Sequence, residues 1–161
     1  MKKALVFIIA LMLAVFLPSC KKEEFKDSAS CEQIGRAIEA TLGDGQEYLR
    51  YDEAHRDLYF DKDEYDDFYS AYSANTTDIS EFGVLHAPDA RTADELYDEA
   101  CDYVSDMKED ERAFIASYAP EELTRLDAAR VKRFGNYVVY TVLDKDTANE
   151  IFKKIEELVK Q

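Results

Sequence analysis

The sequence lacks the short motifs that mark common catalytic and cofactor sites. It contains no P-loop, no Gly-rich dinucleotide loop, no Gly-x-Ser-x-Gly elbow and no His-Glu-x-x-His. It also lacks a Cys-x-x-Cys pair, which argues against structural zinc and thioredoxin-like redox chemistry. The two histidines, His55 and His86, are far apart in the sequence, and a Ser-His-Asp triad is recognised only by its geometry. The sequence therefore predicts no cofactor and leaves enzymatic activity open.

Basic residues are scarce. The chain has 20 Lys and Arg residues against 35 Asp and Glu residues, for a net charge of −15. A nucleic-acid-binding protein needs a basic surface, so the composition argues against nucleic acid as a partner. The charge favours cationic partners instead, such as a divalent metal ion, a polyamine or a basic patch on another protein. The alternative is an acidic surface that serves only solubility.

One long apolar run lies near the start of the chain. Lys2 and Lys3 precede the run Ala4–Leu17, which is shorter than the roughly 20 residues that span a bilayer. The following Leu17-Pro18-Ser19-Cys20 resembles the lipobox of bacterial lipoproteins. We therefore expect residues 1–19 to be a removed signal peptide and Cys20 to carry a lipid that anchors the chain to a bacterial membrane, outside the cytoplasm. The alternative is an ordinary cleaved signal in which Cys20 is incidental.

The residues that follow divide into a short charged segment and one domain. Residues 20–29 are charged and nearly free of apolar side chains, which predicts a flexible tether. Residues 30–161 are enough for a single domain with its own core. Removal of Lys2 and Lys3 with the signal would change the net charge from −15 to −17, because residues 1–19 contain no acidic residue.

Hydrophobic periodicity predicts both helices and strands. Ser30 with Gln33, and Thr92 with Glu95, form capping-box patterns at helix starts. Helical patterns cover residues 31–42, 53–59, 62–69, 93–118 and a last helix capped by Asp146; strand patterns cover residues 79–87 and a hairpin within 129–143 that turns at Gly135-Asn136. This order predicts an α+β fold, with an antiparallel sheet of three or four strands. One long and two shorter helices would pack mainly on one face of it.

Glu81, Tyr137 and Tyr140 are the residues that we expect at a contact surface. Glu81 opens the first predicted strand and could pair with Lys132 or Arg133 of the hairpin, or line a binding groove. Tyr137 and Tyr140 lie on opposite faces of one strand because side chains alternate along it. One of the two should therefore be in the core, and the other could be exposed.

Two further groups of residues could carry chemistry. Asp61, Asp63 and Asp66 belong to an acidic run with alternating oxygen ligands, as Ca²⁺ requires, but the run lacks the Gly of an EF-hand loop and also suits helix capping. Cys31 and Cys101 could form a disulfide outside the membrane, or each could be a small buried apolar side chain.

Three segments resemble a known family. They are residues 78–85 (DISEFGVL), 117–122 (SYAPEE) after the long helix, and 135–139 (GNYVV) in the hairpin. In this order they resemble the bacterial lipoproteins known as domain of unknown function 4358. Members often carry Lys near the end of the first strand, where this chain has His86. The resemblance implies lipoprotein character and supplies no activity.

Three functions remain open at this point. The first is a membrane-tethered, non-enzymatic binding or accessory module with a protein partner in the cell envelope. The second is an envelope enzyme that uses paired carboxylates. The third is capture of a cation, such as Ca²⁺ or a polyamine, or of another basic ligand by the acidic surface. We favour the first.

Overall fold

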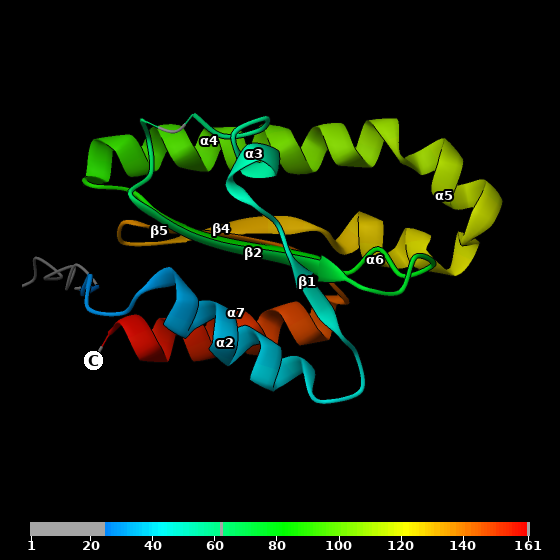
Figure 1. Ribbon diagram of the computed structural model, residues 1–161, viewed down its shortest axis with the longest axis horizontal. Helices are drawn as coiled ribbons and strands as arrows, with labels where there is room; N and C mark the ends of the chain where they lie inside the picture. Colours follow the sequence, from blue (N-terminus) through cyan, green and yellow to red (C-terminus); the bar gives the residue numbers. More distant parts are fainter. Residues whose placement is uncertain (1–24, 62, 161) are drawn as a thin grey trace, which may run out of the picture.

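The computed structural model describes residues 25–61 and 63–160 and has an α+β fold (Figure 1). The sheet is antiparallel, and its strands lie in the order β1-β2-β3-β5-β4. The strands are β1 (Tyr48–Arg50), β2 (Asp67–Ser73), β3 (Glu81–His86), β4 (Arg130–Phe134) and β5 (Tyr137–Val142). The α+β prediction is confirmed, with five strands in the described part of the chain in place of three or four.

Helices cover both faces of the sheet (Figure 1). One face packs on α2 (Cys31–Leu42) and α7 (Lys145–Val159), and the other packs on α4 (Ala90–Asp110). The prediction that helices pack mainly on one face is therefore wrong. The physical reason is the sequence of β5, in which every residue is buried, so that both of its faces need a cover.

The predicted helix over residues 93–118 is two helices. It begins earlier, at Ala90, because the side chain of Asp89 accepts hydrogen bonds from the backbone N–H groups of Arg91 and Thr92 and so caps the helix in place of Thr92. The helix ends at Asp110, and α5 (Arg112–Tyr118) continues in a new direction (Figure 1). Short helices complete the chain: α3 (Glu53–Arg56), a 3₁₀ turn (Pro120–Glu122) and α6 (Leu123–Ala128).

Strand β2 replaces the helix predicted over residues 62–69. Its residues alternate between the two faces, with Tyr69 and Ala71 in the core beneath α2 and Phe68 packed against the α4 side. Six residues of β2 pair with β3. Cross-strand pairing of this kind outweighs local propensity, which is why a local pattern did not reveal the strand.

Local signals predicted the ends of α2 and the hairpin correctly. The side chain of Ser30 accepts from the backbone of Gln33, whose side chain accepts in turn from the backbone of Ser30. Gly135 has a φ of 63° in the turn between β4 and β5, a conformation that favours glycine. The last helix is preceded by Asp144 rather than capped by Asp146.

The segment from Phe25 to Ala29 lies against the domain. Phe25 packs edge-on against Phe134, with ring centroids 6.1 Å apart, and the backbone N–H of Lys26 donates to the carbonyl of Val159 at 2.7 Å. The side-chain amide of Asn136, in the hairpin turn, donates to Asp27 at 2.8 Å. The predicted flexible tether over residues 20–29 therefore does not extend to these residues.

Residues 1–24, which include the predicted signal and Cys20, lie outside the described residues. Among the residues that the structure describes, none of the helices combines the length and the apolar character needed to cross a membrane.

Candidate ligand-binding pocket around Glu81

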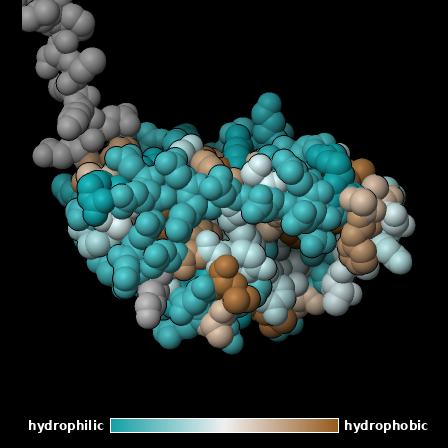
Figure 2. Space-filling view, turned by 90° about the horizontal axis from the view of Figure 1, so that it is seen from above, coloured by the Kyte–Doolittle hydropathy of each residue, from teal (hydrophilic) through white to brown (hydrophobic). Residues whose placement is uncertain are grey.

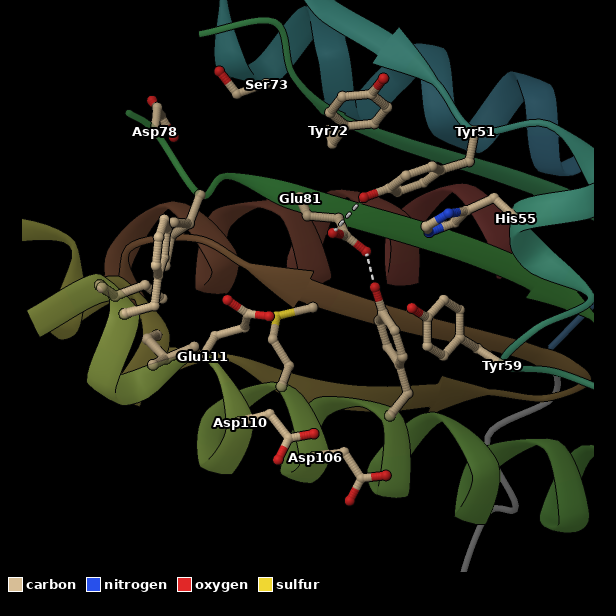
Figure 3. Close-up of a pocket in the computed structure, with 16 residues that line it drawn as sticks. Tyr51, His55, Tyr59, Tyr72, Ser73, Asp78, Glu81, Asp106, Asp110 and Glu111 are labelled. Carbon is tan, nitrogen blue, oxygen red and sulfur yellow. Dashed lines mark hydrogen bonds between the residues drawn. The ribbon is translucent and has the colours of Figure 1, made fainter. Parts of the chain in front are cut away.

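Glu81 is a buried carboxylate held by three tyrosines. It is the first residue of β3, is only 6 % exposed and points to the α4 side of the sheet. Its Oε1 accepts hydrogen bonds from the hydroxyls of Tyr103 (2.6 Å) and Tyr140 (3.0 Å), and its Oε2 accepts one from Tyr51 (3.0 Å) (Figure 3). A buried charge is tolerated only with such partners, so the tyrosines stabilise the position of Glu81.

Each tyrosine comes from a different element. Tyr51 follows β1, Tyr103 lies on α4, and Tyr140 lies on β5 directly opposite Gly83 of β3. The ring of Tyr140 lies over Gly83, where a Cβ atom would stand 2.1 Å from its Cε1. The missing side chain of Gly83 is therefore what allows the Tyr140 hydroxyl to reach Glu81.

Burial dominates the electrostatics of this cluster. Desolvation raises the pKa of Glu81 above its usual value, although the hydrogen bonds from Tyr103, Tyr140 and Tyr51 act in the opposite direction. Desolvation and the nearby Glu81 also raise the pKa of all three tyrosines. The hydroxyls therefore keep their protons at neutral pH and remain donors to Glu81.

A pocket of about 450 Å³ opens beside this cluster, between the sheet and the helices α3 to α6. Its lining combines aromatic rings, carboxylates and apolar side chains. The aromatic residues are Tyr51, His55, Tyr59, Tyr72, Tyr103 and Phe114; the acidic residues are Asp78, Glu81, Asp106, Asp110 and Glu111; the rest are Ser73, Ile79, Met107, Ile115 and Leu126. The described lining includes no Lys or Arg, so the pocket is strongly acidic for its size.

Stacked rings form one wall of the pocket. The ring of Tyr51 lies between His55, at a centroid distance of 3.7 Å and an interplanar angle of 2°, and Tyr72, at 4.4 Å. Tyr59 contacts Tyr103 edge-on at 4.8 Å. Burial lowers the pKa of His55, so this imidazole is neutral at pH 7 and adds no positive charge to the wall.

The acidic side chains differ in their partners. The carboxylate of Asp78 accepts hydrogen bonds from Arg125 at 2.7 Å and from Gln46 at 2.6 Å. Burial opposes the ionisation of Asp78, but hydrogen bonds from Ser80 and the charge of Arg125 lower its pKa overall. Glu111 has no hydrogen-bond or ionic partner for its side chain among the described residues. In Figure 3 its carboxylate points into the pocket, on the side opposite the tyrosine wall.

The family assignment follows from a match within the described domain. The family model of the domain of unknown function DUF4358 matches residues 39–143. The chain belongs to this family. All of the residues that line the pocket of this DUF4358 domain, from Tyr51 to Leu126, fall within the matched range. Neither a curated protein nor a solved structure matches the chain.

One of our predictions was that Glu81 pairs with Lys132 or Arg133 of the hairpin. In the DUF4358 domain Glu81 pairs with neither. Lys132 pairs with Glu156 at 3.3 Å and Arg133 pairs with Asp94. Both basic residues lie on β4, which β5 separates from β3. Glu81 instead lines the pocket described above; whether this pocket is a binding groove stays a prediction.

Tyr137 and Tyr140 lie on opposite faces of β5, as predicted, but neither is a surface contact. Tyr137 is 1 % exposed and Tyr140 is 2 % exposed, because helices cover both faces of the sheet. The Tyr137 hydroxyl donates to the carbonyl of Ala29 at 2.6 Å and so helps to hold the N-terminal segment. Tyr140 belongs to the Glu81 cluster.

Asp61, Asp63 and Asp66 do not converge. Asp61 accepts from the backbone N–H of Asp63 at 2.9 Å, and Asp66 contacts the Nδ1 atom of His86 at 2.6 Å. In the part of the chain that the structure describes, no three His, Cys, Asp or Glu side chains are grouped so that they could hold a metal ion.

Cys31 and Cys101 are both free, so the disulfide alternative is wrong. Cys31 is buried on the α2 side of the sheet, whereas Cys101 lies on α4, which covers the opposite face. The sheet separates the two residues; Cys31 is buried in the core, whereas Cys101 is only partly buried.

Sequence reasoning named Tyr140 but missed the other two tyrosines that surround Glu81, Tyr51 and Tyr103. Tyr51 precedes Glu81 by 30 residues and Tyr103 follows it by 22 residues. One signal in the sequence could have indicated the cluster: Gly83 is an isolated glycine within a strand, which marks a close approach by another group.

Proposed function

We propose that this chain is a lipid-anchored binding module of the bacterial cell envelope, held outside the cytoplasm by Cys20, and that the Glu81 pocket is its ligand-binding site. The pocket carries this proposal, because binding sites are concave, largely apolar and aromatic, and contain a few polar groups with perturbed pKa values. The lipobox-like Leu17-Pro18-Ser19-Cys20 supports the anchor.

An exposed aromatic pair beside the pocket supports binding of a partner or ligand at this end of the molecule. Phe114 and Tyr118 of α5 are 59 % and 75 % exposed, and their ring centroids are 4.6 Å apart. Figure 2 looks onto the α4 side, where hydrophilic atoms cover most of the surface; hydrophobic atoms are exposed at the end that carries α5 and also at the lower centre of the view. Exposed aromatic patches of this kind favour contact with other molecules.

An envelope enzyme is the second function that an observation supports. Glu81 and Asp78 line the same pocket with pKa values shifted in opposite directions, as a general acid and a carboxylate base would require. However, Asp78 is engaged by Arg125 and Gln46, whereas Glu81 is engaged by the three tyrosines. These contacts favour a binding role over paired-carboxylate catalysis.

Photocrosslinking in cells tests the binding role. A photoreactive phenylalanine analogue would replace Phe114, which lines the pocket and is 59 % exposed. The matched control would replace Leu58, which is 74 % exposed and is not among the described residues that line this pocket. We expect a recurrent adduct from position 114 that position 58 does not give. Identical products from the two positions, or none from position 114, would refute the proposal.

A further inference from the structure

The charge of the Glu81 pocket restricts its ligand. Among the described residues, five carboxylates and no Lys or Arg line it, and Arg125 pairs with only one of the five, that of Asp78. A concave site with charges of one sign and low-dielectric walls concentrates its field, so it repels anions and attracts cations. Aromatic rings add to this attraction when a cation lies against them.

Glu81 retains capacity for one more donor. Each carboxylate oxygen accepts about two hydrogen bonds. Oε1 receives two, from Tyr103 and Tyr140, while Oε2 receives one, from Tyr51. A ligand N–H group could therefore complete the shell at Oε2, and the surrounding phenol oxygens could accept further N–H groups of the same cation.

The pocket suits an organic cation better than a metal ion. Calcium requires about six to eight oxygen ligands, and the described residues contain no group of three or more acidic, His or Cys side chains arranged to hold a metal. Around the carboxylates the lining includes Met107, Ile115 and Leu126. Methylene groups of a ligand would bury apolar area against such side chains.

A second carboxylate is available inside the same pocket. Glu111 lies between α4 and α5, points into the pocket in Figure 3 and has no side-chain partner among the described residues. Glu81 and Glu111 therefore offer two carboxyl groups with apolar and aromatic lining around them. A chain of methylenes with an ammonium group at each end matches this pattern.

We propose that the Glu81 pocket binds an aliphatic diamine or polyamine, with one ammonium group at Glu81 and a second at Glu111. This proposal rests on the proposed function and names the ligand class of the same site. The same chemistry, an ammonium on an alkyl chain, also occurs in the lysine side chain of a protein, so the experiment must distinguish the two sources.

Calorimetric titration of the full-length chain in a nonionic detergent tests the ligand class. The probes are 1,5-diaminopentane, 1-aminopentane and pentane-1,5-diol, which share a carbon chain and differ in charge. We expect saturable binding of the diamine, binding of the monoamine weaker by about fivefold because a partly exposed charge pair contributes modestly, and no binding of the diol. Nα-acetyl-lysine methylamide is the fourth probe, and tighter binding of this probe than of the diamine would overturn the proposal in favour of a protein lysine.

Matched substitutions locate the second ammonium group. Glu111→Gln should weaken diamine binding by about fivefold, to the level of the monoamine, and leave the monoamine unchanged. Glu109→Gln is the control, because Glu109 is exposed in the last turn of α4, two residues before Glu111, and does not line the pocket. Glu81→Gln should abolish binding of both amines, with circular dichroism to verify its fold.

Equal effects of Glu111→Gln and Glu109→Gln, or equal binding of the diamine and the diol, would overturn the proposal. So would the absence of saturable heat with every probe. The proposed function fails separately, since it depends on adducts specific to position 114. An adduct there without amine binding would retain a binding module and reject the diamine.

Discussion

Replacement of Gly83 by alanine should destabilise the domain because it displaces the ring of Tyr140. The new Cβ atom would lie 2.1 Å from Cε1 of Tyr140, whereas ordinary contacts begin at 3.4 Å, so the ring must move by more than 1 Å. Overpacking of a core costs about 1–3 kcal/mol. Movement of the ring also breaks the hydrogen bond from the Tyr140 hydroxyl to Glu81, which contributes about 1–2 kcal/mol to a buried acceptor. Together these effects predict a loss of about 2–5 kcal/mol in the free energy of unfolding.

Urea denaturation followed by circular dichroism measures this loss. Gly45→Ala is the matched control, because a Cβ atom at Gly45 meets nothing within 4 Å, and its effect should stay within about 0.5 kcal/mol. The double variant Gly83→Ala with Tyr140→Val should lose less stability than the sum of the two single variants, since the smaller side chain leaves room for the methyl group. A Gly83→Ala variant as stable as the Gly45→Ala control would refute the packing argument.

Three other predictions concern Glu81 and the cysteines. Burial raises the pKa of Glu81 in the folded state, so the stability that its bound proton contributes is complete below the usual pKa and is lost as the pH rises through the folded pKa. The free energy of unfolding of Glu81→Gln should therefore rise relative to that of the parent chain as the pH rises from 4 to 8, by about 1.4 kcal/mol for each pH unit between the usual pKa and the folded pKa. A pH-independent difference between the two chains in urea titrations would contradict this. Cys20→Ser should shift the protein from the membrane to the soluble extracytoplasmic fraction, whereas an unchanged distribution on immunoblots would argue against the anchor. Cys31 and Cys101 should form no disulfide after oxidation, because the sheet separates them. The electrophoretic mobility of the monomer should therefore be the same with and without reductant. A faster band without reductant that a Cys101→Ser variant lacks would disprove that separation.

Features encoded by neighbouring residues were predictable from the sequence. The capping box of α2 and the turn at Gly135 each depend on a few consecutive residues with known backbone preferences. Glu81 was correctly expected at the start of a strand, because the apolar run that follows it has a strand pattern. The family resemblance also holds, and it depends on short segments of the same kind.

Features encoded by distant residues were not predictable. Strand β2 becomes a strand through pairing with β3 and β1 on either side, which its own acidic and tyrosine-rich sequence does not indicate. The three hydroxyls at Glu81 meet only after the sheet and α4 have assembled. Exposure of Tyr137 and Tyr140 was misjudged for the same reason, since it depends on how many helices cover each face.

The docked segment from Phe25 to Ala29 determines at which end of the domain a lipid anchor would be attached. With a lipid on Cys20, the Cα atom of Phe25 can lie no more than about 18 Å from that of the lipidated residue, at about 3.5 Å per residue. Phe25 and Asp27 contact the hairpin turn, and that turn adjoins the end of β3 at His86. Strand β3 runs from Glu81 to His86, so Glu81 lies about 17 Å from His86 along the strand, at 3.3 Å per residue. Glu81 and its pocket would then lie at the end of β3 remote from the point where the lipid-bearing segment joins the domain.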